Sequence, residues 1–228
     1  MLEKEIATLG LAWPVEFVPA PQEITARCLS QRGQHQILID RYTMADLDGR
    51  GHHLLHELCH CRMAETIDLS MSQMQFLHSA TAEELQRSYL VWAPIDLWVN
   101  RLRHEHWTAA IVAEQNTLRK ELAMIGKNSG IVAGNPSLSI LIALYRVEGE
   151  HYKLAQDTRI LMRALYPNDQ RRIKALEAIM RKMLAMEASV PNLQGAMREF
   201  ARVWGFDFLT AVRLEWADHF QMHCVSWR

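Results

Sequence analysis

The sequence predicts a mainly α-helical protein with a small β-sheet near its N-terminus, an α+β arrangement. Short β-branched segments bounded by Pro, Gly and Gln occur only before Asp40. From about Met44 onward, apolar residues recur at spacings of three and four, which is the helical period. No repeat or low-complexity linker interrupts the chain, so we expect a single domain over residues 1–228. Its sheet and central helices should occupy about 12–116 and a helical remainder about 117–228.

Three segments supply the predicted strands. They are VEFVPA at residues 15–20, EITARCLS at 23–30 and HQILID at 35–40. Each is short and rich in β-branched or aromatic residues, as strands are. The intervening QRGQ, residues 31–34, predicts a hairpin turn, because glycine reaches turn conformations without steric cost.

Two local signals mark helix starts in the middle of the chain. The stretch TAEE at residues 81–84 is a capping box, in which Thr and Glu bond each other's backbone N–H, so a helix should run from there to Val91. Pro94 suits the first turn of a helix, where its missing N–H has no partner to lose. We therefore expect a new or kinked helix from Pro94 to about Asn116.

Apolar periodicity and capping residues predict the other helices. Residues 126–137, GKNSGIVAGNPS, are rich in Gly, Asn and Ser and indicate a loop. Asn192 and Gly205 suit the start and the stop of one late helix. The predicted helices cover about 46–65, 137–147, 150–165, 169–188, 192–203 and 207–222.

Composition and charge narrow the classes of function. The chain is 49% hydrophobic and 22% charged with a net charge of −1, so no basic surface for nucleic acid is expected. Its N-terminus does not resemble a signal peptide, and no stretch has the apolar length of a membrane span. The four cysteines are unevenly spaced, which argues against a disulfide scaffold. We predict a reducing, cytoplasmic location.

The most informative stretch is GHHLLHELCHCRMAE, residues 51–65, which contains HELCH, a match to H-E-x-x-H. On an α-helix, residues four apart share a face, so His56 and His60 can present two imidazoles to one ion. Glu57 can direct its carboxylate at the open coordination position and take a proton from a water bound there. The spacing therefore predicts a catalytic metal site with Zn²⁺ as the default ion.

Catalytic zinc sites use three protein ligands, so one more must come from elsewhere. Glu65 follows His60 by five residues, about 500° around the helix, and points away from it. Asp96 lies among apolar residues in WAPIDLWVN, where an unpaired buried carboxylate would be costly and a metal would offset that cost. Asn100, one turn later, can hydrogen-bond a ligand histidine or Asp96 itself. The other candidates for the third ligand are Asp68, His104, Glu105 and His106.

HELCH followed by a carboxylate on a later helix resembles the zincin metallopeptidases in their gluzincin-like arrangement. The stretch A-x-x-D-x-x-V-N, residues 93–100, is similar to bacterial metallopeptidase domains that occur beside von Willebrand factor A-like domains. The resemblance covers about residues 35–106, and Asp96 stands where Glu is usual, one methylene shorter. It implies a zinc peptidase acting on a peptide or protein, with ligands His56, His60 and Asp96 and the general base Glu57.

Zincins often add a Tyr or His that steadies the oxyanion formed during hydrolysis. His104, His106 and Tyr145 are the candidates for that role. His52, one turn before the first ligand, is a candidate to contact the site or the substrate.

Two cysteines flank the second ligand histidine. Cys59 and Cys61 project about 100° to either side of His60, so we interpret them as small buried apolar residues.

Two alternatives to a peptidase stay open. The chain can instead be a catalytically silent zinc-binding module that regulates or docks a partner. It can also carry a histidine-rich surface helix with no metal at all.

Overall fold

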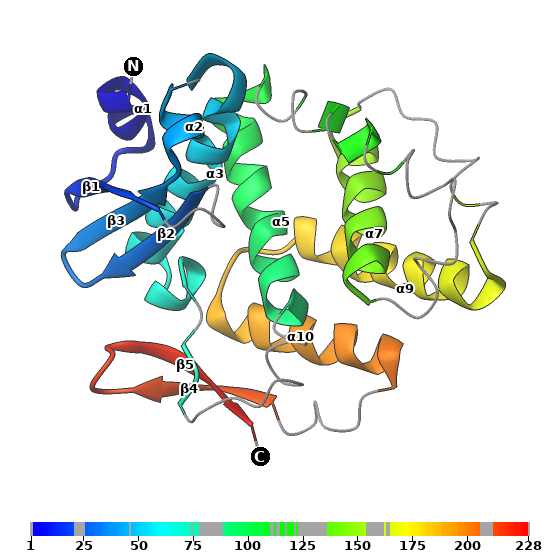
Figure 1. The fold of residues 1–228 in the computed structure, drawn as a ribbon. Helices are drawn as coiled ribbons and strands as arrows, with labels where there is room; N and C mark the ends of the chain where they lie inside the picture. Colours follow the sequence, from blue (N-terminus) through cyan, green and yellow to red (C-terminus); the bar gives the residue numbers. More distant parts are fainter. Residues whose placement is uncertain are drawn as a thin grey trace.

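Helices dominate the computed structural model, and a small sheet lies at its N-terminal side (Figure 1). This confirms the predicted mainly α, α+β class. The structure describes residues 2–20, 26–45, 47–73, 75–77, 89–109, 112, 115–116, 118–120, 122, 136–153, 162, 165–205 and 212–227. The named helices are α1 (Leu2–Leu9), α2 (Arg41–Ala45), α3 (Leu47–Thr66), the 3₁₀ turn η1 (Leu69–Met71), α5 (Tyr89–His106), α7 (Pro136–His151), α9 (Pro167–Leu184) and α10 (Val190–Trp204).

The N-terminal sheet contains the three strands that the sequence predicted. They are β1 (Val15–Pro19), β2 (Ala26–Gln31) and β3 (Gln34–Ile39), in the order β1-β3-β2. β1 runs parallel to β3, and β2 pairs with β3 as an antiparallel hairpin. Gly33 takes a φ of 88° in the hairpin turn, a backbone conformation that favours glycine. The predicted turn at 31–34 is therefore confirmed.

Side chains from outside the sheet satisfy the outer edge of β2. The backbone N–H of Cys28 donates to Glu57 on α3, at 2.6 Å. Beyond it, the N–H of Ser30 donates to Ser72 Oγ at 3.2 Å, and Ser30 O accepts from Gln73 Nε2 at 3.0 Å. These bonds close an edge that would otherwise offer unpaired groups to another strand.

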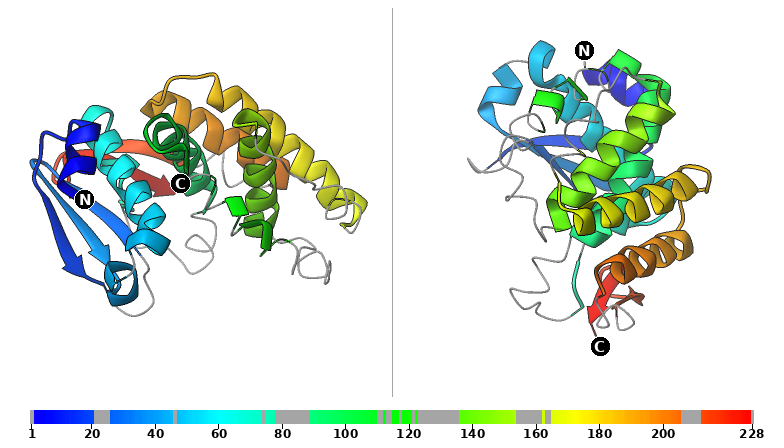
Figure 2. Two further views of the ribbon diagram at one scale, coloured as in Figure 1. Left: turned by 90° about the horizontal axis from the view of Figure 1, so that it is seen from above. Right: turned by 90° about the vertical axis from the view of Figure 1, so that its right-hand side faces the viewer.

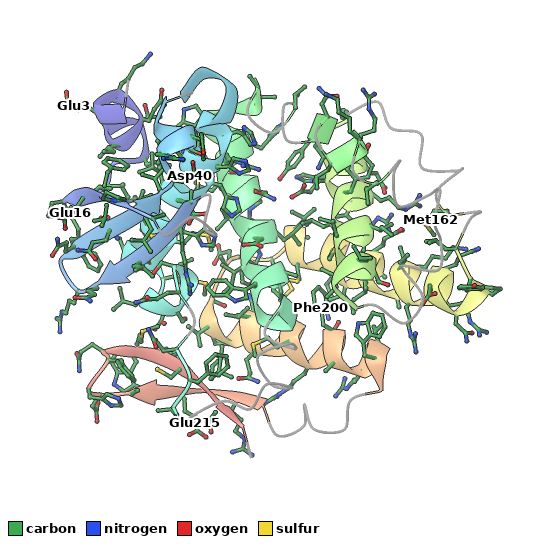
Figure 3. The ribbon with its side chains drawn as sticks, viewed as in Figure 1. Glu3, Glu16, Asp40, Met162, Phe200 and Glu215 are labelled. Atoms are coloured by element: carbon green, nitrogen blue, oxygen red, sulfur yellow. The ribbon has the colours of Figure 1, made fainter. Side chains whose placement is uncertain are left out.

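α3 lies between the sheet and α5, and α7, α9 and α10 lie on the other side of α5 (Figures 1 and 2). One cluster of buried apolar side chains runs through all of these layers. Ile37 of the sheet, Leu58 of α3 and Trp98 of α5 are each almost fully buried. Phe200 continues this core where α10 passes α5 (Figure 3). No described helix is both long enough and apolar enough to cross a membrane.

The predicted helix at 207–222 is wrong. The described part of this segment forms strand β4 (Val212–Ala217), which pairs with β5 (Met222–Trp227) as an antiparallel hairpin. VRLEWA alternates apolar and polar residues, which is the strand period, and the pairing with β5 selects it. The hairpin also bridges to the segment after η1, since Leu77 N donates to Val225 O at 2.9 Å.

Several helix boundaries differ from the predicted ones. α5 begins at Tyr89 and carries Pro94 in its interior, so Pro94 does not start a helix, and α5 ends at His106. α10 is capped by Ser189, whose Oγ accepts from Asn192 N at 3.3 Å, because a hydroxyl there binds an unpaired N–H of the first turn. Gly205 ends α10 at a φ of 68°, as predicted.

The sequence did not predict two short helices. Some of its other predictions fall on residues that the structure does not describe. α1 and α2 are too short for periodicity to reveal; α2 is capped by Asp40, which accepts from Thr43 N at 2.8 Å. The helix predicted at 46–65 is α3. The capping box at 81–84 and most of the segments 126–137 and 150–165 lie outside the described residues.

Candidate metal centre

α3 places the two histidines of HELCH on one face, as their spacing requires. His56 Nε2 and His60 Nε2 lie 3.2 Å apart. The rings meet nearly edge to face, with centroids 4.8 Å apart. Two ring nitrogens at this separation face a common point, which is the arrangement that one shared ion needs.

Asp96 on α5 completes the group. Its Oδ1 lies 3.7 Å from His56 Nε2 and 3.4 Å from His60 Nε2. The three candidate ligand atoms all lie within 4.8 Å of one another. The side chain of Asp96 is 34% exposed, whereas that of His60 is 5% exposed, so the cluster opens to solvent on the Asp96 side. Of the candidate third ligands, the structure brings Asp96 to the two histidines.

Hydrogen bonds at the other ring nitrogens fix the direction of both lone pairs. His60 Nδ1 lies 2.6 Å from the carbonyl oxygen of Met71, which can only accept, so Nδ1 carries the proton. His56 Nδ1 lies 3.1 Å from Asn100 Oδ1 and donates to it. Each Nε2 is then left as the metal-facing atom. Partners of this kind orient metal-binding histidines in proteins.

A buried carboxylate holds Asn100 in the required orientation. Asn100 Nδ2 donates to Glu148 Oε1 at 2.7 Å, which turns Oδ1 toward His56. Gln115 Nε2 donates to the other oxygen of Glu148 at 2.8 Å. Burial raises the pKa of Glu148 to about 7, because the charged form loses its hydration. The predicted contact of Asn100 with a ligand histidine is therefore present, and α7 supports it.

The electrostatics of the cluster favour positive charge. Burial of the His60 ring opposes its protonation, but Asp96 and Glu57 outweigh this effect and raise the pKa of His60 to about 9. Burial also disfavours the charged form of Asp96, yet the two imidazoles hold the pKa of that carboxyl well below its usual range. Protons and a metal ion therefore compete for the same ring nitrogens and carboxylate oxygen, so metal affinity should fall as pH falls.

Glu57 lies on the sheet side of α3 and is half-buried. Its Oε2 accepts the N–H of Cys28 at 2.6 Å, which anchors the carboxylate against β2. The negative charge of Glu57 also contributes to the raised pKa of His60. One carboxylate oxygen is thus bound to the backbone of β2.

The structure places Glu65 and Asp68 in other interactions. Glu65 binds the N–H of Ala12 and of Trp13, and His35 Nε2 lies 3.0 Å from it. Burial opposes the ionisation of Glu65, but these three donors outweigh it and lower its pKa. Asp68 caps η1 and lies 2.6 Å from the His223 ring. Neither carboxylate belongs to the His56–His60 group.

The remaining predicted residues lie on the surrounding helices. His104 stacks on Tyr152 with centroids 4.0 Å apart, and Tyr145 is buried in the core. His52 packs against the His53 ring, and its carbonyl accepts from Arg103 at 3.2 Å. Glu105 and His106 are exposed at the end of α5. Roles for His52, His104, His106 and Tyr145 in substrate binding or oxyanion stabilisation stay predictions.

The sequence did not predict three groups that support the candidate metal centre. The Met71 carbonyl and the Cys28 N–H are backbone groups, which no side-chain pattern reveals. Glu148 offered a signal, because it is a carboxylate within the largely apolar helix LSILIALYRVEGEH. The argument that selected Asp96 applies equally to it.

No family model matches this chain, and no similar protein was found among curated proteins or solved structures. The ligand set itself therefore defines the class of site. Two imidazoles and one carboxylate on adjacent helices form a candidate site for one divalent transition metal.

Proposed function

We propose that this protein is a zinc-dependent peptidase. The observation that carries the proposal is the convergence of His56 Nε2, His60 Nε2 and Asp96 Oδ1, with both Nδ1 atoms bound to acceptors. The Asp96 side chain is 34% exposed, so water or a substrate could reach the group from this side, as a catalytic zinc site requires. Zincin metallopeptidases, which the HELCH stretch resembles, use the same ligand types.

Each residue of the group has a separate role in the proposed hydrolysis. Zn²⁺ held by these three ligands would polarise a peptide carbonyl and lower the pKa of a coordinated water. Glu57 then takes a proton from the attacking water and delivers it to the leaving amine. The Cys28 N–H positions Glu57 for this transfer by holding one carboxylate oxygen. Asn100 and Met71 keep the two imidazoles aimed at the ion.

One observation favours the alternative, a zinc-binding module without catalysis. The bond between Glu57 and the Cys28 N–H ties α3 to β2, and a carboxylate can serve this structural purpose without acting as a base. Iron(II) is also bound by two histidines and a carboxylate in oxygenases, so metal identity has to be measured. Zinc is our choice because Glu57 gives a hydrolytic site its base.

Substitution of Glu57 separates these possibilities. The wild-type chain and Glu57→Gln are purified without a histidine tag, and their metal content is measured by elemental analysis. Each protein is then incubated with a mixture of unstructured peptides, and new termini are detected by mass spectrometry. We expect the same zinc content in both proteins and a loss of cleavage of at least about 100-fold in Glu57→Gln.

Glu105→Gln is the matched control, since Glu105 is an exposed carboxylate on α5. It should retain both zinc and cleavage. A zinc-loaded wild type that cleaves no peptide would overturn the peptidase and leave the silent module. Purification with iron in place of zinc would contradict zinc as the ion of this centre.

A further inference from the structure

A second group of potential ligands lies between α3 and the sheet. It consists of Cys28 on β2, His35 on β3 and Cys61 on α3, each with 0% exposure. One ligand atom from each lies within 4.8 Å of the others. The two sulfur atoms are 3.2 Å apart. The group shares no residue with the His56–His60–Asp96 cluster.

Glu65 determines which nitrogen of His35 can bind a metal. Its carboxylate accepts the N–H groups of Ala12 and Trp13, at 2.8 to 3.0 Å, and is therefore held in place. His35 Nε2 lies 3.0 Å from the same carboxylate, so Nε2 carries the proton. The lone pair is then on Nδ1. A carboxylate on the far nitrogen is the usual support of a metal-binding histidine.

Ser30 connects this lone pair with the thiols. Its hydroxyl lies 2.7 Å from His35 Nδ1 and 3.4 Å from Cys28 Sγ. A metal on Nδ1 would occupy the place of this hydroxyl, so binding requires Ser30 to rotate about its Cα–Cβ bond, which moves the oxygen off the ring nitrogen. One ligand atom of His35 and both sulfurs already lie within 4.8 Å of one another, so these three residues can then bind one ion.

We propose that Cys28, His35 and Cys61 form a second zinc site, separate from the candidate catalytic centre. Two thiolates and one imidazole are the donor set of zinc, whereas Mg²⁺ and Ca²⁺ select oxygen ligands. Full burial of all three residues favours a structural role over a catalytic one, because no described side chain of the group opens to solvent or substrate. The group supplies three of the four ligands that structural zinc sites usually have.

This site would couple the sheet to the catalytic helix. Cys61 and Glu57 are one helical turn apart on α3, and both contact Cys28, through its sulfur and its backbone N–H respectively. An ion that binds Cys28 to Cys61 fixes β2 against α3 and so fixes the anchor of Glu57. The inference does not depend on peptidase activity.

Cobalt(II) gives a direct test, since it substitutes for zinc and absorbs in the near ultraviolet when thiolates bind it. The metal-free, reduced full-length chain is titrated with Co²⁺. The His56–His60–Asp96 cluster contains no sulfur, so a thiolate band can come only from a cysteine site. We expect the wild type to bind two equivalents and to show the thiolate band.

Cys59→Ser is the matched control, because Cys59 is equally buried on α3 but does not belong to the group. It should keep two equivalents and the band, whereas Cys61→Ser should bind one equivalent without the band. Circular dichroism checks the folding of each variant. If Cys61→Ser does not fold, the wild-type titration still decides.

A wild type that binds metal without a thiolate band would overturn the proposal. So would a Cys28–Cys61 disulfide in the purified protein, detected by peptide mass mapping without reduction. Because the band and the count of equivalents require no turnover, this test can fail while the peptidase proposal stands, and the reverse also holds.

Discussion

Two stripes of α3 carry two different kinds of candidate site. One stripe presents His56 and His60, four residues apart, to Asp96 on α5. The neighbouring stripe presents Glu57, Cys61 and Glu65, also four apart, to the sheet. The first group is partly open, with Asp96 34% exposed, and has nitrogen and oxygen donors. The ligands of the second are fully buried and mostly sulfur. Open and closed coordination distinguish catalytic from structural zinc, and this difference is the basis of the two roles proposed for the two groups.

The two groups also differ in how they are supported. His56 and His60 are oriented from outside α3, by Asn100 on α5 and by the Met71 carbonyl on η1. η1 is in turn held by the C-terminal hairpin, since Asp68 accepts from His223 N at 3.1 Å. His35 is oriented by Glu65 of α3 itself. Substitutions at the first group should therefore change metal binding, whereas substitutions at the second group should change the stability of the fold.

Asp96→Ala should have the largest effect on metal binding. Zinc sites with a full ligand set bind with about 10–16 kcal/mol, so the loss of one ligand should weaken zinc by about 1,000-fold at the first group. Competition with a chromophoric chelator measures this affinity. The thiolate–cobalt band of the second group should be unchanged. Asp218→Ala, an exposed carboxylate in the β4–β5 turn, is the control and should keep wild-type affinity.

Unchanged zinc affinity in Asp96→Ala would contradict the His56–His60–Asp96 site. The two stripes would then no longer differ in the way that their exposure indicates, and the third ligand would have to be another residue.

Glu65→Ala should destabilise the fold and leave the first group intact. Its carboxylate is 5% exposed, and removing it leaves the buried His35 ring and the Trp13 N–H without their acceptor. We expect a loss of about 2 to 4 kcal/mol in the free energy of unfolding, measured by urea denaturation in the presence of a chelator. Zinc affinity at His56 and His60 should stay within about threefold of wild type, less than a tenfold step of 1.4 kcal/mol.

Glu16→Ala is the control for this substitution. Glu16 is also a carboxylate with two side-chain donors, Gln34 and Gln36, but it is exposed at the outer edge of the sheet (Figure 3). Its removal should change stability by less than about 0.5 kcal/mol. Equal effects of the two substitutions would contradict this stabilising role of the buried Glu65 carboxylate.

The first site was predictable because its information is local. HELCH fixes two imidazoles and a carboxylate within one turn of helix, and Asp96 and Asn100 repeat that spacing on α5. The second site was not predicted, since Cys28 and His35 reach Cys61 only through the register of β2 and β3. Cys61 was correctly expected to be buried, but nothing in its neighbours along the chain indicates a sulfur 3.2 Å away.

The fold shows the same division between local and distant information. The N-terminal strands carry turn and β-branched signals of their own, and they form as predicted. The segment VRLEWA fits both a strand and a helix, and it forms a strand because β5 pairs with it and Val225 bridges to Phe76. Short apolar segments of this kind take the structure that tertiary contacts favour over local propensity.

Asn100→Ala should have the smallest of these effects and tests how the first group is supported. Without the amide, His56 Nδ1–H loses its acceptor, and the ring can turn its Nε2 away from His60. Loss of such a partner costs about 10- to 100-fold in metal affinity, so this variant should fall between wild type and Asp96→Ala. Asn168→Ala, at an exposed position on α9, is the control and should bind zinc as the wild type does. Unchanged affinity in Asn100→Ala would mean that the packing of α3 against α5 alone aims His56. The two stripes would then still differ in exposure and in donor atoms. His56 would not depend on a hydrogen-bond partner at its Nδ1 atom.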